Sequence, residues 1–322
     1  MKKNAALYFS VLVITLLFSG FSLIKWGFFA HKKINRYAVF TLPEPLFGFY
    51  RTHIEVITAR AVNPDMRRHL VVGEPPKHYI DLDHYCEDRN AVFDSVPLYW
   101  KKAVEKYTED TLKAYGIVPW VVNWQFYKLK DAFKAHDWEQ AIRISADLGH
   151  YVADAHVPLH TTKNYNGQLT NQKGIHAFWE SRLPELFFDE YDLFVGKSSY
   201  VENVQTYIWK SIKESHAAVD SVFMQEKILS EQYEGMKYAY EPRGKNIVKT
   251  YSLPYSTAYN KALGGMVERR IRKSVVVLGS IWYTAWVDAG QPNLPNKYKI
   301  PILATDSMEQ QSPNIKKGRM HE

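Results

Sequence analysis

The sequence predicts an all-α fold: a single domain of many helices with ionisable side chains facing one another between them. Three observations predict it. Apolar residues recur at a spacing near 3.6 along several segments, and no long segment alternates apolar and polar residues as a strand would. His150 and His176 are each followed four residues later by a carboxylate, Asp154 and Glu180. Apolar residues make up 46% of the 322 residues, so the chain can bury a sizeable core.

Helical spacing of apolar residues defines the elements of this domain. Pro, Gly and Asn mark the loops between them, including one at Asn63-Pro64. The segment 161–174 is polar and rich in Gly and Asn, so it is also predicted to be a loop. The domain is expected over residues 26–304, followed by a polar tail over 305–322. The predicted helices cover residues 28–40, 46–61, 97–115, 138–157, 203–231 and 256–288.

The N-terminal segment predicts export. A short basic start, Met1–Lys3, precedes an uncharged apolar run over residues 5–24. This pattern is typical of a secretory signal peptide, and Gly20 with Ser22 favours cleavage after Ser22, so that the leader would be residues 1–22. The run is also about long enough to span a bilayer, which leaves an uncleaved membrane anchor as the alternative. The protein is therefore expected to be periplasmic or secreted, and membrane-anchored if the leader stays attached.

Charge and cysteine content limit the kinds of site that the chain can carry. The formal net charge is +7, and without Lys2, Lys3 and Lys25 the balance is 38 basic against 34 acidic residues, or +4. This excess is too mild to indicate nucleic-acid binding by itself. Cys86 is the only cysteine, which excludes an intramolecular disulfide and a zinc site made of thiolates. Any metal must therefore bind to nitrogen and oxygen.

The segment from His150 to His160 carries the strongest functional signal. His150 and Asp154 are four residues apart, so they project from one face of a helix. Pro158 ends or bends that helix and can turn His160 toward the same point. After the polar loop, His176 and Glu180 repeat the spacing of four residues. The two pairs can then face each other from neighbouring helices.

Facing pairs of His and carboxylate side chains are typical of a metal site. Zinc binds neutral imidazole nitrogen and carboxylate oxygen at about 2 Å, and helical bundles supply such ligands from facing helices. One pair alone would be weak evidence, because surface helices use the same spacing for ion pairs. In an apolar segment, however, ionisable residues are unfavourable unless they are paired or bind a metal. The sequence therefore predicts a zinc cluster between the helices.

Together with motifs further upstream, these residues resemble a known superfamily. The motifs in chain order are W-x4-H (Trp26 to His31), D-x-x-R (Asp65 to Arg68), HYID (His78 to Asp81), H-x3-D-x5-H (His150 to His160) and H-x3-E (His176 to Glu180). This combination resembles the superfamily that joins bacterial zinc-dependent phospholipase C with the fungal and plant single-strand-specific nucleases. The resemblance implies an all-α hydrolase of phosphate esters that binds up to three zinc ions per chain.

The resemblance also implies a role for each residue. Asp65 would bind metal or orient the attacking water, and Arg68 would clamp the phosphate through two hydrogen bonds. Three zinc ions and three carboxylates leave a charge of about +3, which attracts a phosphate. In the family the mature chain begins at the tryptophan, whereas Lys25 precedes Trp26 here. One ion would be held by Asp65, His78, His150 and Asp154, a second by His160, His176 and Glu180, and a third by His31, Asp154 and the backbone of Trp26.

The sequence leaves the substrate open among three alternatives. The spacing of Trp26 and His31 and the Asp65-x-x-Arg68 pair favour a single-strand nuclease or 3′-nucleotidase, in which Tyr79 would stack on a base and Asp81 would accept from its edge. Glu180 and the Thr170–Gly174 loop favour a phospholipase C acting on phospholipid. A secreted zinc-binding protein without activity is the third alternative, although structural zinc sites are normally closed and four-coordinate. The expected partner is therefore single-stranded nucleic acid or nucleotides, with phospholipid as the alternative, and no protein partner is indicated.

Overall fold

The structure is a computed structural model that describes residues 27–295, apart from residues 87, 89–90 and 244–245. The predicted leader or anchor, Trp26 and the polar tail over 305–322 lie outside the described residues. Within them the chain is almost entirely helical, with one two-stranded sheet, which confirms the all-α prediction. The described helices include none that is long and apolar enough to cross a membrane.

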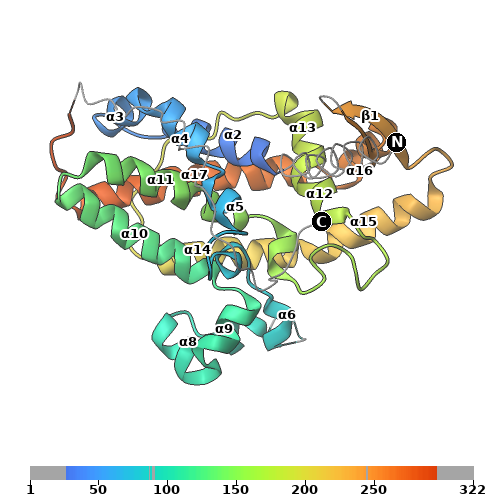
Figure 1. Cartoon of the computed structure of the whole chain (residues 1–322), viewed down its shortest axis with the longest axis horizontal. Coiled ribbons are helices and arrows are strands. Elements are labelled where there is room, and N and C mark those ends of the chain that lie inside the picture. Colours follow the sequence, from blue (N-terminus) through green and yellow to red (C-terminus); the bar gives the residue numbers. More distant parts are fainter. Residues whose placement is uncertain (1–26, 87, 89–90, 244–245, 296–322) are drawn as a thin grey trace, which may run out of the picture.

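Most helices over residues 46–115 are short, whereas those over residues 118–154, 204–232 and 266–288 are longer (Figure 1). Four short helical turns complete them, at Pro75–His78, Pro158–Thr161, Phe178–Arg182 and Phe188–Glu190. The helices are α2 (Phe28–Val39), α3 (Leu46–Thr52), α4 (Ile54–Arg60), α5 (Asn63–Arg67), α6 (Leu82–Tyr85), α7 (Val92–Ser95), α8 (Trp100–Tyr107), α9 (Glu109–Tyr115), α10 (Val118–Lys134), α11 (Trp138–Asp154), α12 (Ile175–Ala177), α13 (Leu183–Phe187), α14 (Val204–Ala217), α15 (Val219–Gln232), α16 (Leu253–Ala262) and α17 (Met266–Asp288).

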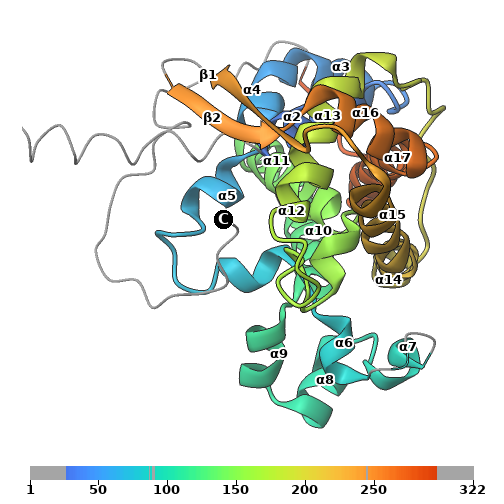
Figure 2. The ribbon, with the colours of Figure 1, turned by 90° about the vertical axis from the view of Figure 1, so that its right-hand side faces the viewer.

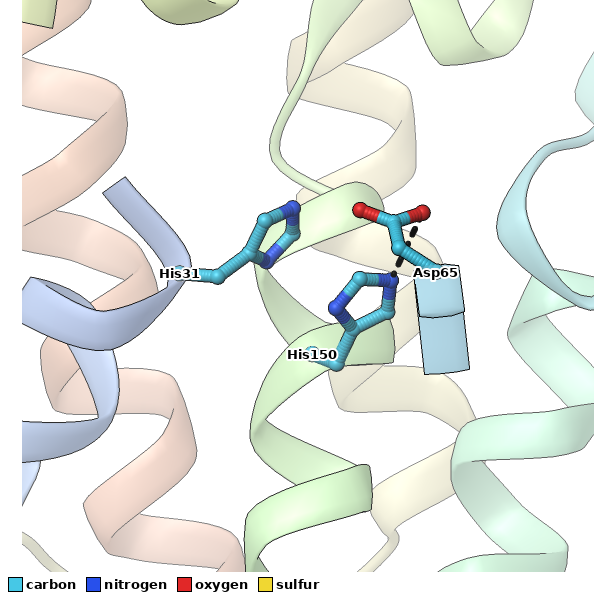
Figure 3. A group of neighbouring side chains, drawn as sticks. All are labelled: His31, Asp65 and His150. Atoms are coloured by element: carbon cyan, nitrogen blue, oxygen red, sulfur yellow. Dashed lines mark ion pairs between the residues drawn. The ribbon is translucent and has the colours of Figure 1, made fainter. Parts of the chain in front are cut away.

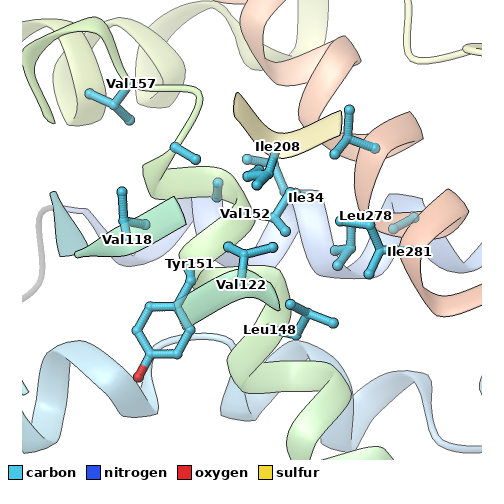
Figure 4. Packing of buried hydrophobic residues seen from close by; sticks show 14 of the residues in the cluster. Ile34, Val118, Val122, Leu148, Tyr151, Val152, Val157, Ile208, Leu278 and Ile281 are labelled. Carbon is cyan, nitrogen blue, oxygen red and sulfur yellow. The ribbon is translucent and has the colours of Figure 1, made fainter. Parts of the chain in front are cut away.

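The core is built around α11, which packs against α2, α4, α10 and α17. Apolar side chains from these helices interdigitate in one buried cluster (Figure 4). Burying a side chain of this size contributes roughly 1.5–3 kcal/mol, so the cluster fixes α11 firmly against its neighbours. The helix that supplies two predicted ligands is therefore a rigid element. Its neighbours in the cluster include Ile34 of α2, Val122 of α10 and Leu278 of α17, which meet Leu148 and Val152 of α11.

A buried asparagine joins three helices next to the predicted ligands. The side-chain amide of Asn35 on α2 donates to the carbonyl oxygens of Ala146 on α11, at 3.0 Å, and of Ile57 on α4, at 3.3 Å. Gly149 faces this amide, and a Cβ at that position would collide with the side chain of Asn35. The glycine therefore lets α2 approach α11 closely beside His150.

Two smaller units extend from the bundle. Helices α6 to α9 form a projection away from the core helices, visible in both ribbon views (Figures 1 and 2). Strands β1 (Tyr238–Arg243) and β2 (Asn246–Tyr251) pair antiparallel, with Tyr238 opposite Tyr251. The ring of Tyr251 stacks on Phe178 with 3.7 Å between centroids, which attaches the hairpin to the segment that carries Glu180.

The structure divides several of the predicted helices and contains elements that were not predicted. The predicted helices 46–61, 97–115, 203–231 and 256–288 are each divided in two, for example at Gly264 and Gly265, which both adopt positive φ. Helix α10 was not predicted; Pro119 lies in its first turn, where proline is well tolerated. Likewise Asn63-Pro64, predicted to be a loop, begins α5. The short β-hairpin was not predicted either, because each strand has only six residues.

Candidate metal centre

Predicted ligands from distant parts of the chain converge at one end of α11. They form four overlapping groups, and within each group one nitrogen or oxygen atom of every residue lies within 4.8 Å of those of the other members. The groups are His31/Asp65/His150, His78/His150/Asp154, His160/His176/Glu180 and His31/Asp154/Glu180. The structure thus brings together every predicted ligand except Trp26, which lies outside the described residues. Side-chain clusters that could hold metal between helices agree with the predicted fold.

The first predicted ion site corresponds to a compact group on α11 and the turn before α6. Nδ1 of His78 lies 3.0 Å from Oδ2 of Asp154 and 3.0 Å from Nε2 of His150. Asp65 of α5 lies at its edge, with Oδ1 3.6 Å from Nε2 of His150 and 3.7 Å from Nδ1 of His78. His78, His150 and Asp154 are almost fully buried, whereas the Asp65 side chain is 23% exposed. Asp65 is therefore the member of this group that an incoming ligand could reach.

The second predicted ion site corresponds to the group formed after α11 ends. Helix α11 stops at Asp154 rather than at residue 157, and the turn that begins at Pro158 carries His160 inward. Nε2 of His160 lies 3.0 Å from Nε2 of His176 and 3.3 Å from Oε2 of Glu180. Nε2 of His176 lies 2.6 Å from the same oxygen. The Pro158 bend thus does what its position in the sequence predicts.

His31 on α2 links the two groups. Its Nε2 lies 3.6 Å from Oδ1 of Asp154 and 3.4 Å from Oε1 of Glu180. Figure 3 shows His31 and His150 side by side, with Asp65 facing them from α5; the two rings stack with 4.0 Å between centroids. The resemblance assigned only Asp154 to two ions. In the structure Glu180 also belongs to two groups, through its two different oxygens.

Two histidines are oriented for metal binding by the backbone. Nδ1–H of His150 donates to the carbonyl oxygen of Ala61 at 2.9 Å, and Nδ1–H of His160 donates to that of His78 at 2.7 Å. A neutral histidine has one N–H, so each donation leaves the lone pair of Nε2 directed into the cluster. Histidines that bind metal usually have this outer partner. The donor atoms and their orientation therefore fit a zinc site.

Burial and neighbouring charges shift the pKa values in the cluster. Burial raises the pKa of Asp154 to about 7, although His160 and His31 act in the opposite direction. Burial also raises the pKa of Glu180, but His160 and the hydrogen bonds from the surrounding histidines outweigh it, so this pKa lies well below its ordinary value. Burial, followed by the nearby His150, holds the pKa of His78 well below its ordinary value. A neutral imidazole is the form that binds a metal.

Arg68 lies at the end of α5 beside Asp65, with an Nη1 to Oδ1 distance of 4.0 Å. The arginine is only 8% exposed, and its Nη2 has no hydrogen-bond partner among the described residues. A buried guanidinium with an unused donor is costly unless an anion binds to it. Arg68, the predicted clamp, therefore lies beside the cluster with a buried donor that an anionic ligand could accept from.

The predicted base-binding residues lie deeper than an open pocket would place them. Tyr79 is 4% exposed, and its hydroxyl donates to the carbonyl oxygen of Ala114 at 3.5 Å. Asp81 is 7% exposed. Neither residue belongs to the four metal-binding groups. A base could stack on Tyr79 only if the surrounding segment moved.

One residue next to the cluster was missed at the level of sequence. Glu74 is 1% exposed and lies 3.8 Å from Nε2 of His78, its Oε1 facing that nitrogen. Glu74 and His78 are four residues apart, the same spacing as in the two recognised pairs. The signal was therefore present, but Glu74 does not belong to the motifs that carry the resemblance.

Comparisons with known proteins leave the family unassigned. No protein-family model and no curated protein matches the sequence. Among solved structures, the chain is similar to an alpha-toxin of Clostridium perfringens isolated from avian strain SWCP, with 12% identity and a TM-score of 0.45. The aligned part covers 85% of this chain and 66% of that chain. A similarity this weak identifies neither a family nor a function.

Proposed function

We propose that the protein is a zinc-dependent hydrolase of phosphate esters. The observation that carries this proposal is the buried, unpaired donor of Arg68 beside a cluster of His, Asp and Glu. The cluster offers only nitrogen and oxygen ligands, which suits zinc, and the guanidinium offers a forked donor, which suits a phosphate. When bound, zinc would supply Lewis-acid catalysis at a phosphoryl oxygen.

The chain's own residues would hold and orient the substrate. Arg68 would donate to a phosphoryl oxygen through Nη2, because this donor has no partner among the described residues. Asp65, the most exposed carboxylate of the cluster, would orient water toward the phosphorus, since 23% of its side chain is exposed and its oxygens can accept hydrogen bonds. Asp154 and Glu180, deeper in the cluster, would act as metal ligands and stay away from the substrate.

The leaving group distinguishes a nuclease from a phospholipase C, and a specific observation favours the latter. Tyr79 and Asp81, on which a base pocket depends, are both buried. By contrast, three consecutive aliphatic residues that begin two positions after Arg68 are exposed, with Leu70 at 38%, Val71 at 42% and Val72 at 94%. Exposed apolar side chains this close in sequence to Arg68 would suit acyl chains better than nucleotides. Phospholipid is therefore the favoured substrate class, and single-stranded nucleic acid or a 3′-nucleotide is the second candidate.

A substrate panel tests the proposal. Purified zinc-loaded protein would be assayed on a small chromogenic phosphodiester, single-stranded DNA, RNA, 3′-nucleotides and phosphatidylcholine. We expect zinc-dependent hydrolysis of the chromogenic diester and of one natural class. Hydrolysis of phosphatidylcholine without nucleic-acid cleavage would support the phospholipase hypothesis, and the reverse result would support the nuclease hypothesis. Tight zinc binding with no hydrolysis of any substrate would instead support a non-catalytic zinc protein.

We also propose that the protein acts outside the cytoplasm, and this proposal rests on the sequence of residues 1–24.

A further inference from the structure

His78 lies between the metal-binding group and Glu74. Its Nδ1 faces Asp154 and His150, at 3.0 Å from each. Its Nε2 faces Oε1 of Glu74 at 3.8 Å and makes no hydrogen bond to the described residues. Both side chains are buried, with His78 at 0% and Glu74 at 1% exposure. The imidazole therefore has a cluster of ligands on one edge and a single carboxylate on the other.

Three donors hold the Glu74 carboxylate in place. Tyr151 of α11 donates a short hydrogen bond to Oε1, and Nε of Arg67 lies 3.2 Å from the same oxygen. Lys77 donates to Oε2 at 2.6 Å. Arg67 is fixed in turn by Asp147, with its Nη1 2.9 Å from Oδ2 of that residue. The carboxylate is thus oriented by both α5 and α11. Its Oε1, which accepts from Tyr151 and pairs with Arg67, is also the oxygen that faces Nε2 of His78.

The direction of the histidine proton decides whether His78 can bind metal. A neutral imidazole carries its proton on one nitrogen and offers a lone pair on the other. His150 and His160 place their protons on Nδ1, against backbone carbonyls. His78 must do the reverse, because its Nδ1 is the atom that faces the other ligands. The distance of 3.8 Å to Glu74 exceeds a hydrogen bond, so forming one requires the two side chains to approach each other by about 0.6–1.1 Å.

We propose that Glu74 positions His78 for metal binding: its carboxylate accepts the Nε2–H of His78 and leaves the Nδ1 lone pair directed at the group formed by His150 and Asp154. This inference rests on the proposed zinc site and adds to it an outer residue that fixes one ligand. Glu74 touches neither metal nor substrate and is therefore a positioning residue. Outer carboxylates of this kind commonly raise metal affinity about 10- to 100-fold.

Zinc affinity of matched variants tests the proposal without reference to activity. Glu74→Gln keeps the shape of the side chain and removes its charge, and Glu74→Met removes the acceptor altogether. Asp147→Asn is the control, because it removes the other carboxylate bound to Arg67. Competition with a chelator of known affinity should show zinc binding weakened about 10- to 100-fold in Glu74→Met, less in Glu74→Gln, and unchanged in Asp147→Asn. Equal losses in the Glu74 and Asp147 variants would overturn the proposal, since they would reflect the whole network.

A measurement on the wild-type protein covers the case in which a Glu74 variant fails to fold. Nitrogen NMR of zinc-loaded protein with ¹⁵N-labelled histidine should show His78 protonated on Nε2 and unprotonated on Nδ1. A proton on Nδ1 of His78 would refute the proposal. Both readouts are independent of hydrolysis. Wild-type protein that binds zinc and protonates His78 on Nε2, yet hydrolyses no phosphate ester, would refute the proposed function and leave the role of Glu74 intact.

Discussion

Arg68 and Asp65 lie side by side at the edge of a cluster whose other members are almost fully buried. The side chain of Asp65 is 23% exposed, whereas that of Arg68 is only 8% exposed. Burying a charged group with an unused donor is unfavourable, so it persists in proteins mainly where a ligand completes its hydrogen bonds. At the residue scale, this pair is therefore the feature on which the proposed phosphate binding depends, and a purely structural metal site would have no need of it.

Replacing Arg68 by lysine should slow hydrolysis and leave metal binding unchanged. Lysine keeps the charge but cannot donate two parallel hydrogen bonds to a phosphate. Removing one such donor typically costs about 10²–10³ in kcat. The measurement is kcat on a chromogenic phosphodiester, together with the zinc content of the variant. The control is Arg36→Lys, because Arg36 forms a half-exposed ion pair with Glu55 on the surface, at 2.7 Å. Loss of zinc from Arg68→Lys, or an unchanged kcat, would contradict the role of a clamp.

At the scale of elements, the sequence predicted α2 and α11 better than it predicted the ends of helices, and it predicted a loop where α5, which carries Asp65, begins. His150 and Asp154 lie on one face of α11, because residues four apart share a face of an α-helix, and His176 and Glu180 meet across α12 and the turn Phe178–Arg182. The positions at which helices end depend on tertiary packing and on single residues such as Gly265. Apolar periodicity alone therefore predicted one continuous helix where the structure has two. The spacing of residues in the sequence also cannot predict how deeply a side chain is buried. The burial of Tyr79, for example, is evident only from the structure.

The contact between α2 and α11 makes Gly149 a sensitive position. A methyl group there would collide with the Asn35 side chain, so Gly149→Ala should cost about 1–3 kcal/mol in the free energy of unfolding. Gly48→Ala is the matched control: it lies inside α3, and its nearest neighbour is the flexible end of Glu44 at 3.3 Å. This control should be neutral or stabilising by up to about 1 kcal/mol. Urea denaturation of the metal-free proteins measures both, and equal stabilities would show that α2 can move away from α11.

Glu226 attaches the loop before His176 to α15. Its buried carboxylate accepts hydrogen bonds from Gln172 at 2.6 Å and from Tyr255 at 2.8 Å, and it pairs with Lys237 at 2.6 Å. Burial raises the pKa of Glu226, but Lys237 and the hydrogen bonds from Gln172 and Tyr255 outweigh it, so the pKa lies below its ordinary value of 4.5. The folded carboxyl thus ionises more readily than the unfolded one.

This shift predicts a pH dependence that Glu226→Gln should abolish. The unfolded state binds more protons below pH 4.5, so the contribution of Glu226 is complete above that pH and is lost as the pH falls through the folded pKa. The stability difference between wild type and Glu226→Gln should be about 1–3 kcal/mol at neutral pH and should shrink in acid. Denaturation of both proteins between neutral pH and pH 3 tests this. A difference that stays constant over this range would mean that the carboxylate charge is not what stabilises the loop.

At the scale of the whole molecule, the helical bundle places three carboxylates and five histidines around one end of α11, most of them buried. Such a concentration of ionisable groups is unfavourable in a protein interior unless they are paired or bind metal. The rigid packing of α2, α10 and α17 around α11 keeps these side chains together, and Asp65 beside Arg68 is the most exposed carboxylate of the cluster. The arrangement thus places a candidate metal centre beside the unused donor of Arg68 within a single fold.

The zinc content of the purified protein tests this account most directly. We expect elemental analysis of protein saturated with zinc and then freed of excess ion to show more than one zinc per chain, since two of the four groups, His78/His150/Asp154 and His160/His176/Glu180, have no residue in common. A chelator should remove both the metal and the hydrolysis of a chromogenic phosphodiester, and added zinc should restore both. One zinc or none per chain, with activity indifferent to the chelator, would contradict the account.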